Sequence, residues 1–141
     1  MRDKKGVHNS FQSPDSINAI DWSRKALHAD VFAYYKSLIQ LRKNHPAFRM
    51  GDAEQVRTHL EFLPVEGTNV VAYRLKEHAG GDAWGDIVVV LNARKEAAKV
   101  TVPEGKYTVV CKDGFISEQG LSTLYGPELS VPAQSALIVY K

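Results

Sequence analysis

The side chains that carry out most enzymatic chemistry are present in this sequence, but not at catalytic spacing. The five histidines show no pairing typical of metal ligands; they are His8, His28, His45, His59 and His78. No Gly-x-Ser-x-Gly motif provides a serine nucleophile. Carboxylates are plentiful, yet no predicted strand ends in two that could face one scissile bond. The residues alone therefore indicate no catalytic centre.

Four residues have side chains suited to binding a polyol or a sugar. Asp15 and Asn18 lie three positions apart in a loop that begins with Pro14, and both could hydrogen-bond hydroxyl groups. The same residue types also commonly turn the backbone. Trp84 and Tyr125 could stack on sugar rings, although lone aromatic residues near turns more often pack against protein. Spacing leaves both alternatives open at each position.

No cofactor site is predicted. Gly80-Gly81-Asp82 is not followed by a helical pattern, so it lacks the backbone amides of a phosphate-binding loop and is predicted to be a turn. The single cysteine, Cys111, excludes an internal disulfide and a cysteine-based zinc site. It lies in a β-like run, where we expect it to act as a small hydrophobic residue.

Composition indicates one globular unit. The chain has 141 residues, of which 44% are hydrophobic, enough for one main core. The formal charge is +2 and the basic residues are scattered, so nucleic-acid binding is not indicated. No apolar run approaches the roughly 18 residues of a membrane span, and no signal-type segment follows the N-terminus. We expect a soluble protein without a membrane partner; its compartment is not indicated.

One long helix is predicted over residues 30–45. Its apolar stripe recurs at steps of three and four residues and consists of Val31, Tyr34, Tyr35, Leu38, Leu41 and His45. Asp30 is the predicted N-cap, and Pro46 ends the helix. We expect a β-sandwich to bury this stripe, so that Leu38→Ala costs roughly 2 to 5 kcal/mol.

Residues 56–141 have the two-residue period of β-strands. Strands are predicted at 56–62, 71–75, 87–91, 99–102, 107–111, 129–131 and 136–140, with an irregular segment before residue 129. Residues 87–91 are apolar on both sides, which predicts a central strand. Residues 99–102 and 107–111 are predicted to form a hairpin. The predicted fold class is mainly β with one long N-terminal helix, arranged as an antiparallel β-sandwich.

Residues 1–29 show neither the helical period of three to four residues nor the two-residue period of a strand. They mix loop residues with apolar ones such as Phe11, Ile17 and Trp22. A loop of this length is usually functional. We predict that it packs on something larger than this chain.

The amino-acid sequence of these segments resembles that of a known family. The motif that carries the resemblance is Asn9-Ser10-Phe11-Gln12-Ser13-Pro14-Asp15-Ser16-Ile17-Asn18-Ala19-Ile20-Asp21-Trp22. Together with residues 31–49, it closely resembles the C-terminal part of type I pullulanases, in the α-amylase family of glycoside hydrolases. Residues 131–140 look like the final strand of that family's C-terminal β domain.

The resemblance implies a division of the chain. Residues 1–29 correspond to the last βα loop of a (β/α)8 barrel, residues 30–46 to the last barrel helix, and residues 47–141 to a C-terminal antiparallel β-sandwich domain. The family's catalytic carboxylates lie on earlier barrel strands and map nowhere in this sequence. The isolated chain is therefore predicted to be inactive, and no cofactor is expected.

The resemblance implies that the chain is the C-terminal portion of a debranching enzyme that hydrolyses α-1,6 linkages in pullulan, amylopectin or glycogen products. In that enzyme it would support the catalytic barrel and supply a loop on the substrate side. Its partners would be the upstream barrel and an α-glucan. Asp15 falls where many relatives place a sugar-contacting aspartate, with Asn18 beside it; Ala19 replaces an arginine that some relatives have. The alternatives are a stand-alone carbohydrate-binding β-sandwich, which needs an exposed aromatic row, and a purely structural domain that shields the barrel.

Overall fold

The structure is a computed structural model that describes residue 11 and residues 13–141. The remaining residues, 1–10 and 12, include the start of the predicted loop and lie outside the described residues. The chain divides into two compact units, Met1–Phe32 and Ala33–Lys141. Each unit is described by itself.

The first unit contains two short helices, α1 (Asp15–Asn18) and α2 (Ser23–Leu27), and the start of α3 (Ala29–Asn44). These two short helices lie within residues 1–29, the segment in which the sequence shows no sustained helical or strand period. Two hydrogen bonds to Asp21 Oδ1 stabilise the entry to α2, one from Ser23 N at 3.1 Å and one from Ser23 Oγ at 2.5 Å. These bonds lower the pKa of Asp21. None of the described residues of this unit is buried.

The long helix is confirmed as α3. Asp30 lies inside its first turn rather than before it. At the other end, Arg42 donates to the carbonyl of Phe48, and Arg49 Nη2 donates to Lys43 O at 3.2 Å. These guanidinium groups satisfy carbonyls that helix ends leave without intrahelical partners. The 3-10 helix η1 (Pro46–Arg49) follows directly.

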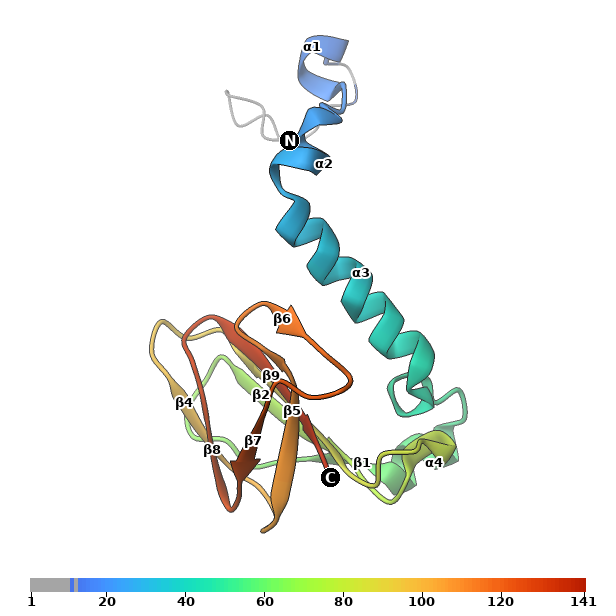
Figure 1. Ribbon diagram of the computed structural model, residues 1–141, viewed down its shortest axis with the longest axis vertical. Coiled ribbons are helices and arrows are strands. Elements are labelled where there is room, and N and C mark those ends of the chain that lie inside the picture. Colours follow the sequence, from blue (N-terminus) through green and yellow to red (C-terminus); the bar gives the residue numbers. More distant parts are fainter. Residues whose placement is uncertain (1–10, 12) are drawn as a thin grey trace. The chain divides into compact units, whose positions relative to one another are not determined.

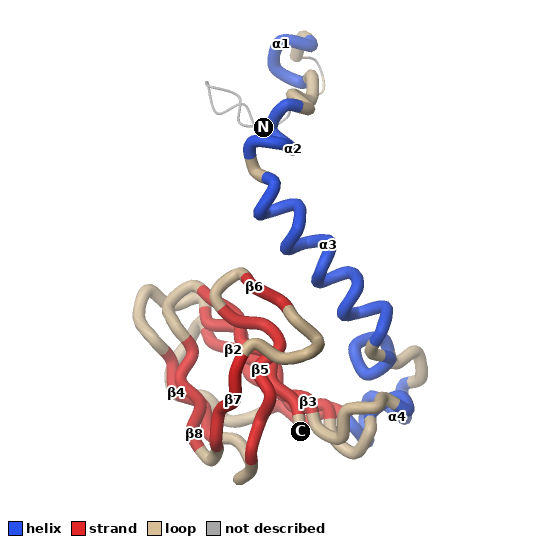
Figure 2. Tube along the Cα trace, viewed as in Figure 1, coloured by secondary structure: helices blue, strands red, loops and turns tan. Residues whose placement is uncertain are grey.

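The strand predicted over residues 56–62 was wrong for most of its length. Residues Ala53–His59 form helix α4, drawn in blue in Figure 2. Only Leu60–Phe62 form a strand, β1. Asp52 Oδ1 accepts hydrogen bonds from Glu54 N at 2.7 Å and Gln55 N at 3.1 Å, which caps the helix. This capping outweighs an alternating pattern too short to establish a strand.

The strands form two antiparallel sheets, which confirms a mainly β fold with a long helix N-terminal to it. The large sheet has the order β1-β2-β3-β9-β5-β6, with β7 also paired to β5, and the small sheet pairs β4 with β8. The remaining strand bounds are β2 (Val70–Leu75), β3 (Ile87–Asn92), β4 (Ala98–Thr101), β5 (Lys106–Lys112), β6 (Phe115–Ile116), β7 (Ser122–Tyr125), β8 (Glu128–Val131) and β9 (Ser135–Tyr140). The segment expected to be irregular thus contains β7.

The predicted hairpin of β4 and β5 was also wrong, because the two strands belong to different sheets. The chain crosses between the sheets at residues 102–105, where Val102 N donates to Pro127 O at 2.8 Å. Val100 and Tyr107 then face the same core from opposite sheets. An alternating pattern fits strands that stack face to face as well as strands that pair edge to edge.

Two hydrophobic clusters cover the two faces of the large sheet. One lies between the sheets and includes Val88, Val90, Val100, Tyr107 and Leu129. The other lies between the large sheet and the helical segments (Figure 1), where Leu41, Ala47 and Ala79 pack with Ile87 and Val89. β3 lies between β2 and β9 and contributes to both clusters, which confirms the predicted central strand.

The expectation that the β domain buries the whole stripe of the long helix was wrong. Leu41 is the buried residue of α3, and His45, just beyond the helix, is buried as well. Tyr34 and Leu38 are half-buried, whereas Val31 and Tyr35 are exposed. The sheet therefore covers only the C-terminal part of the stripe.

We predict that Leu41, rather than Leu38, is the position of the helix most sensitive to truncation. Leu41→Ala should cost roughly 2 to 4 kcal/mol of unfolding free energy, because a buried leucine leaves a cavity. Leu38→Ala serves as the matched control and should cost clearly less, because this side chain is only partly buried. Urea denaturation of the two variants measures the difference, and equal losses would contradict the observed burial.

Within the part of the chain that the structure describes, no helix has the length and apolar character needed to cross a membrane.

Candidate functional site

The two predicted sugar-binding residues lie on α1. Asp15 begins this helix and Asn18 ends it, and both side chains are exposed. Asn18 Nδ2 donates to Ser13 O at 3.0 Å, so the amide closes its own turn. No hydrogen bond to the Asp15 carboxylate is found among the described residues, and the side chain does not cap α1. The turn alternative thus has support at Asn18, and Asp15 remains the residue predicted to contact a ligand.

The two aromatic candidates differ in their surroundings. Trp84 is half-buried and stacks against His45, with ring centroids 3.5 Å apart, and against Tyr140, with centroids 4.0 Å apart. Both faces of this indole are therefore occupied by protein rings, which favours the packing alternative. Tyr125 on β7 is 68% exposed, and its role as a stacking platform stays a prediction.

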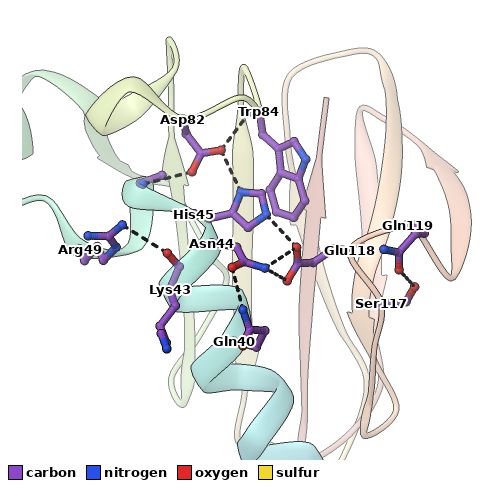
Figure 3. A network of polar contacts seen from close by, with 11 residues as sticks. Gln40, Lys43, Asn44, His45, Arg49, Asp82, Trp84, Ser117, Glu118 and Gln119 are labelled. Carbon is purple, nitrogen blue, oxygen red and sulfur yellow. Dashed lines mark hydrogen bonds and ion pairs between the residues drawn. The ribbon is translucent and has the colours of Figure 1, made fainter.

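The main polar cluster of the second unit is centred on His45 and Asp82 (Figure 3). The His45 Nδ1 and Asp82 Oδ1 atoms are 2.9 Å apart, and the Asp82 side chain is fully buried. Asp82 also accepts hydrogen bonds from Ala47 N at 3.2 Å and Trp84 N at 3.0 Å. Because a carboxylate only accepts, Nδ1 carries the hydrogen in this pair. One buried side chain thus satisfies donors from both η1 and the β2–β3 loop.

The opposite side of the His45 ring faces the β6–β7 loop. His45 Nε2 lies 3.7 Å from Glu118 Oε2. Asn44 Nδ2 donates to the two oxygens of Glu118 at 2.9 and 3.0 Å, and Gln40 Nε2 donates to Asn44 Oδ1 at 2.7 Å. The cluster therefore joins the end of α3 to two loops that lie far apart in the sequence.

This geometry indicates that the cluster has a structural role rather than a catalytic one. A His–Asp pair activates a nucleophile only if the second ring nitrogen reaches a hydroxyl or thiol. Among the described residues, His45 Nε2 faces the carboxylate of Glu118 instead, and Trp84 covers one face of the ring. The cluster is therefore a structural joint between α3 and the large sheet.

Sequence reasoning missed the role of Asp82. The prediction of a turn at Gly80-Gly81-Asp82 is confirmed, with Gly80 and Gly81 at φ +62° and +77°. The available signal was His45, a polar residue on an apolar stripe, since a buried imidazole needs a hydrogen-bonding partner. Spacing could not identify that partner, which lies 37 positions away.

Cys111 is buried, as expected for a small hydrophobic residue, and is not in a disulfide. Its Sγ lies 3.7 Å from the Tyr34 hydroxyl. Burial raises the pKa of the Cys111 thiol, and it raises the pKa of Tyr34 to about 12. No group of three His, Cys, Asp or Glu side chains suited to a metal ion occurs in the described ranges.

Comparison with known proteins adds an independent observation. The family described as "Pullulanase, all-beta domain" matches residues 56–114. A pullulanase of Bacillus subtilis (strain 168) is 40% identical over 119 residues, which are 84% of this chain and 16% of that protein. The chain is therefore similar to pullulanases over most of its length. The region from α4 to the end of β5 is thus similar to a domain of pullulanases.

Solved structures of pullulanases superpose on nearly the whole chain. One from Bacillus acidopullulyticus has a TM-score of 0.90 and 43% identity, and it covers 99% of this chain and 17% of its own. A pullulanase from Anoxybacillus sp. LM18-11, complexed with maltotriose, has a TM-score of 0.81 and 32% identity over 99% of this chain and 19% of its own. The chain spans less than a fifth of the length of these relatives.

Proposed function

We propose that this chain is the C-terminal portion of a debranching enzyme that hydrolyses α-1,6-glucosidic linkages in pullulan, amylopectin or glycogen-derived glucans. The observation that carries the proposal is the 40% identity to a pullulanase over 84% of the chain. The reaction would use two carboxylates in a retaining mechanism, supplied by another part of the parent enzyme.

In this proposal, residues 1–46 belong to the catalytic barrel. Residues 1–29 are its last βα loop, residues 30–46 its last helix, and residues 47–141 the β domain that follows. The exposed apolar residues Val31, Tyr35 and Ile39 support this division. Their spacing of four positions places them along one side of α3, where they would pack on the barrel.

Asp15 is the proposed contact to the substrate. It is exposed, and no described residue hydrogen-bonds its carboxylate. In the parent enzyme this carboxylate would accept hydrogen bonds from a glucosyl hydroxyl pair. Asn18 would act beside it mainly by holding the turn, through its 3.0 Å bond to Ser13.

The stand-alone carbohydrate-binding module has less support. Such a module needs an exposed aromatic row, and Trp84 is occupied on both faces by His45 and Tyr140. The His45–Asp82 pair instead links the end of α3 to the large sheet, which is suited to supporting that helix.

We predict that the isolated chain does not hydrolyse pullulan, whereas the full-length parent protein does. A substrate groove needs both walls, and this chain supplies one loop of one wall. Reducing-sugar release from pullulan by both proteins at equal molar concentration measures the difference. Release above the blank by the isolated chain would contradict the proposed division of labour. An inactive parent would contradict the proposed reaction itself.

A further inference from the structure

A small cavity lies between α3 and the loop that joins β6 to β7, within the second unit. Its volume is about 350 Å³. Polar side chains of the helix line one side of it and polar side chains of the loop line the other; they are Ser37, Gln40, Asn44, Ser117, Glu118 and Gln119. The steps of three and four positions place the three helical residues along one side of α3. The cavity therefore has a polar wall on each of two distant segments.

Hydrogen bonds hold most of these side chains in one orientation (Figure 3). Gln40 Nε2 donates to Asn44 Oδ1 at 2.7 Å, and Asn44 Nδ2 donates to the Glu118 carboxylate at 2.9 and 3.0 Å. On the loop, Ser117 Oγ donates to Gln119 Oε1 at 3.3 Å. Side chains that are already ordered lose less conformational entropy when a ligand binds. The polar lining is thus partly preorganised.

Several hydrogen-bonding atoms of the lining are still free to bind a ligand. No hydrogen bond from Gln119 Nε2 or Ser37 Oγ is found among the described residues, and the Gln119 amide has two hydrogens to donate. Gln40 Oε1 can accept a hydrogen bond. The Glu118 carboxylate can accept more than the contacts from Asn44. Donors and acceptors therefore occur together around one cavity.

This mixture matches a neutral ligand with several hydroxyl groups, because each hydroxyl both donates and accepts. An anion such as phosphate would be repelled by Glu118. A metal ion would lack ligands, since the described residues contain no group of three His, Cys, Asp or Glu side chains suited to one. An amine only donates, so it would leave Gln119 Nε2 without an acceptor. The chemistry of the lining thus favours a sugar.

We propose that this cavity is an accessory site for the end of an α-glucan chain, whose hydroxyl groups bind to Gln40, Glu118 and Gln119. The choice of an α-glucan among sugars rests on the proposed function, because the parent enzyme would act on that polymer. The cavity is near the lower limit of small-molecule sites, which measure about 300 to 1,000 Å³, so it suits a chain end rather than a long stretch of chain.

Binding at this site should be weak. No aromatic ring lines the cavity among the described residues, so hydrogen bonds that compete with water supply most of the affinity. We expect a Kd in the millimolar range. A second weak contact with the same polymer raises the local concentration of substrate and keeps the enzyme near it between cleavage events. This role differs from that of a stand-alone binding module.

Titration of the 141-residue chain with maltotriose, followed by two-dimensional NMR of backbone and side-chain amides, tests the site. The side-chain amide signals of Gln40 and Gln119 should shift and reach saturation. Gln119→Ala should raise the Kd roughly three- to tenfold, because it removes a hydrogen-bond donor. Gln55→Ala, at an exposed position of α4 outside the cavity, is the matched control and should leave the Kd unchanged. Cellotriose, whose β linkages turn the second ring to a different angle, should bind more weakly.

The full-length parent shows whether the enzyme uses the site. There, Gln119→Ala should raise KM for amylopectin about threefold and leave kcat unchanged, because the substitution removes binding without altering the cleavage step. The control Gln55→Ala should alter neither constant.

The remaining outcomes overturn the inference. They are the absence of saturable shifts in the chain, shifts centred on Tyr125 instead of the cavity, equal binding of cellotriose, and an unchanged KM in the parent with Gln119→Ala. Because binding is measured without hydrolysis, a chain that binds maltotriose in a parent that does not cleave pullulan would refute only the proposed reaction. An active parent whose chain shows no shifts would refute only the accessory site.

Discussion

Asp82→Ala should destabilise the second unit by about 3 to 5 kcal/mol, as removal of one partner from a buried ion pair or hydrogen-bonded cluster does. The substitution leaves three donors without their acceptor: His45 Nδ1, Ala47 N and Trp84 N. The ring stack of His45 on Trp84 would lose its anchor at the same time. Urea unfolding followed by tryptophan fluorescence measures the loss, because Trp84 lies in the cluster. The other tryptophan, Trp22, is 74% exposed and contributes a background signal.

Two further variants identify the cause of this loss. Asp82→Asn keeps one acceptor oxygen at nearly the same volume, so it should cost clearly less than Asp82→Ala. Glu96→Ala removes an exposed carboxylate outside the cluster and should stay within about 0.5 kcal/mol of the unsubstituted chain. If Asp82→Ala costs no more than Glu96→Ala, the joint does not hold the helical segments to the sheet.

Asp15→Ala in the full-length parent should lower kcat/KM for pullulan by roughly ten- to hundred-fold. A hydrogen bond to a charged group contributes about 1.5 to 3 kcal/mol, which corresponds to that range of rates. Stability should barely change, because Asp15 is exposed and no described residue hydrogen-bonds its side chain. Steady-state kinetics and a thermal melt of the same preparation measure both quantities.

Asp15→Asn separates substrate binding from a local role in the turn. If Asp15 only holds its own loop, the asparagine should preserve activity, and Asp15→Ala should lower the melting temperature together with the rate. If the carboxylate binds a sugar, Asp15→Asn should lose much of the rate at an unchanged melting temperature. A parent enzyme with Asp15→Ala and unaltered kcat/KM would remove Asp15 from the substrate site.

Much of the fold could be predicted from local patterns. The long helix has a clear 3.6-residue period, and Pro46 marks its end, so its bounds were predicted to within one residue at each end. β3 was recognisable from its unbroken apolar run. The predictions that were wrong concern segments whose sequence pattern fits two different structures. Residues 56–62 alternate like a strand, but most of them belong to a helix capped by Asp52. Likewise, β4 and β5 alternate in the same way whether they pair or stack.

The candidate sites could be predicted only in part. The family resemblance, rather than spacing, singled out Asp15, and the packing role of Trp84 required knowledge of its neighbours His45 and Tyr140. Asp82 could not be predicted as the partner of His45, because a hydrogen bond between segments far apart in the sequence produces no periodic sequence pattern. The cavity between α3 and the β6–β7 loop could not be predicted for the same reason, since its two sides lie far apart in the sequence.

The position of β9 has a consequence for synthesis on the ribosome. β9 is the last strand of the chain, yet it lies between β3 and β5 and pairs with both. Until residues 135–140 leave the exit tunnel, β3 and β5 each have one edge without its native neighbour, and the large sheet exists only as separate halves. Native-like protection of β3 can therefore arise only after translation of this segment, and nascent chains need shielding of two apolar strand edges until then.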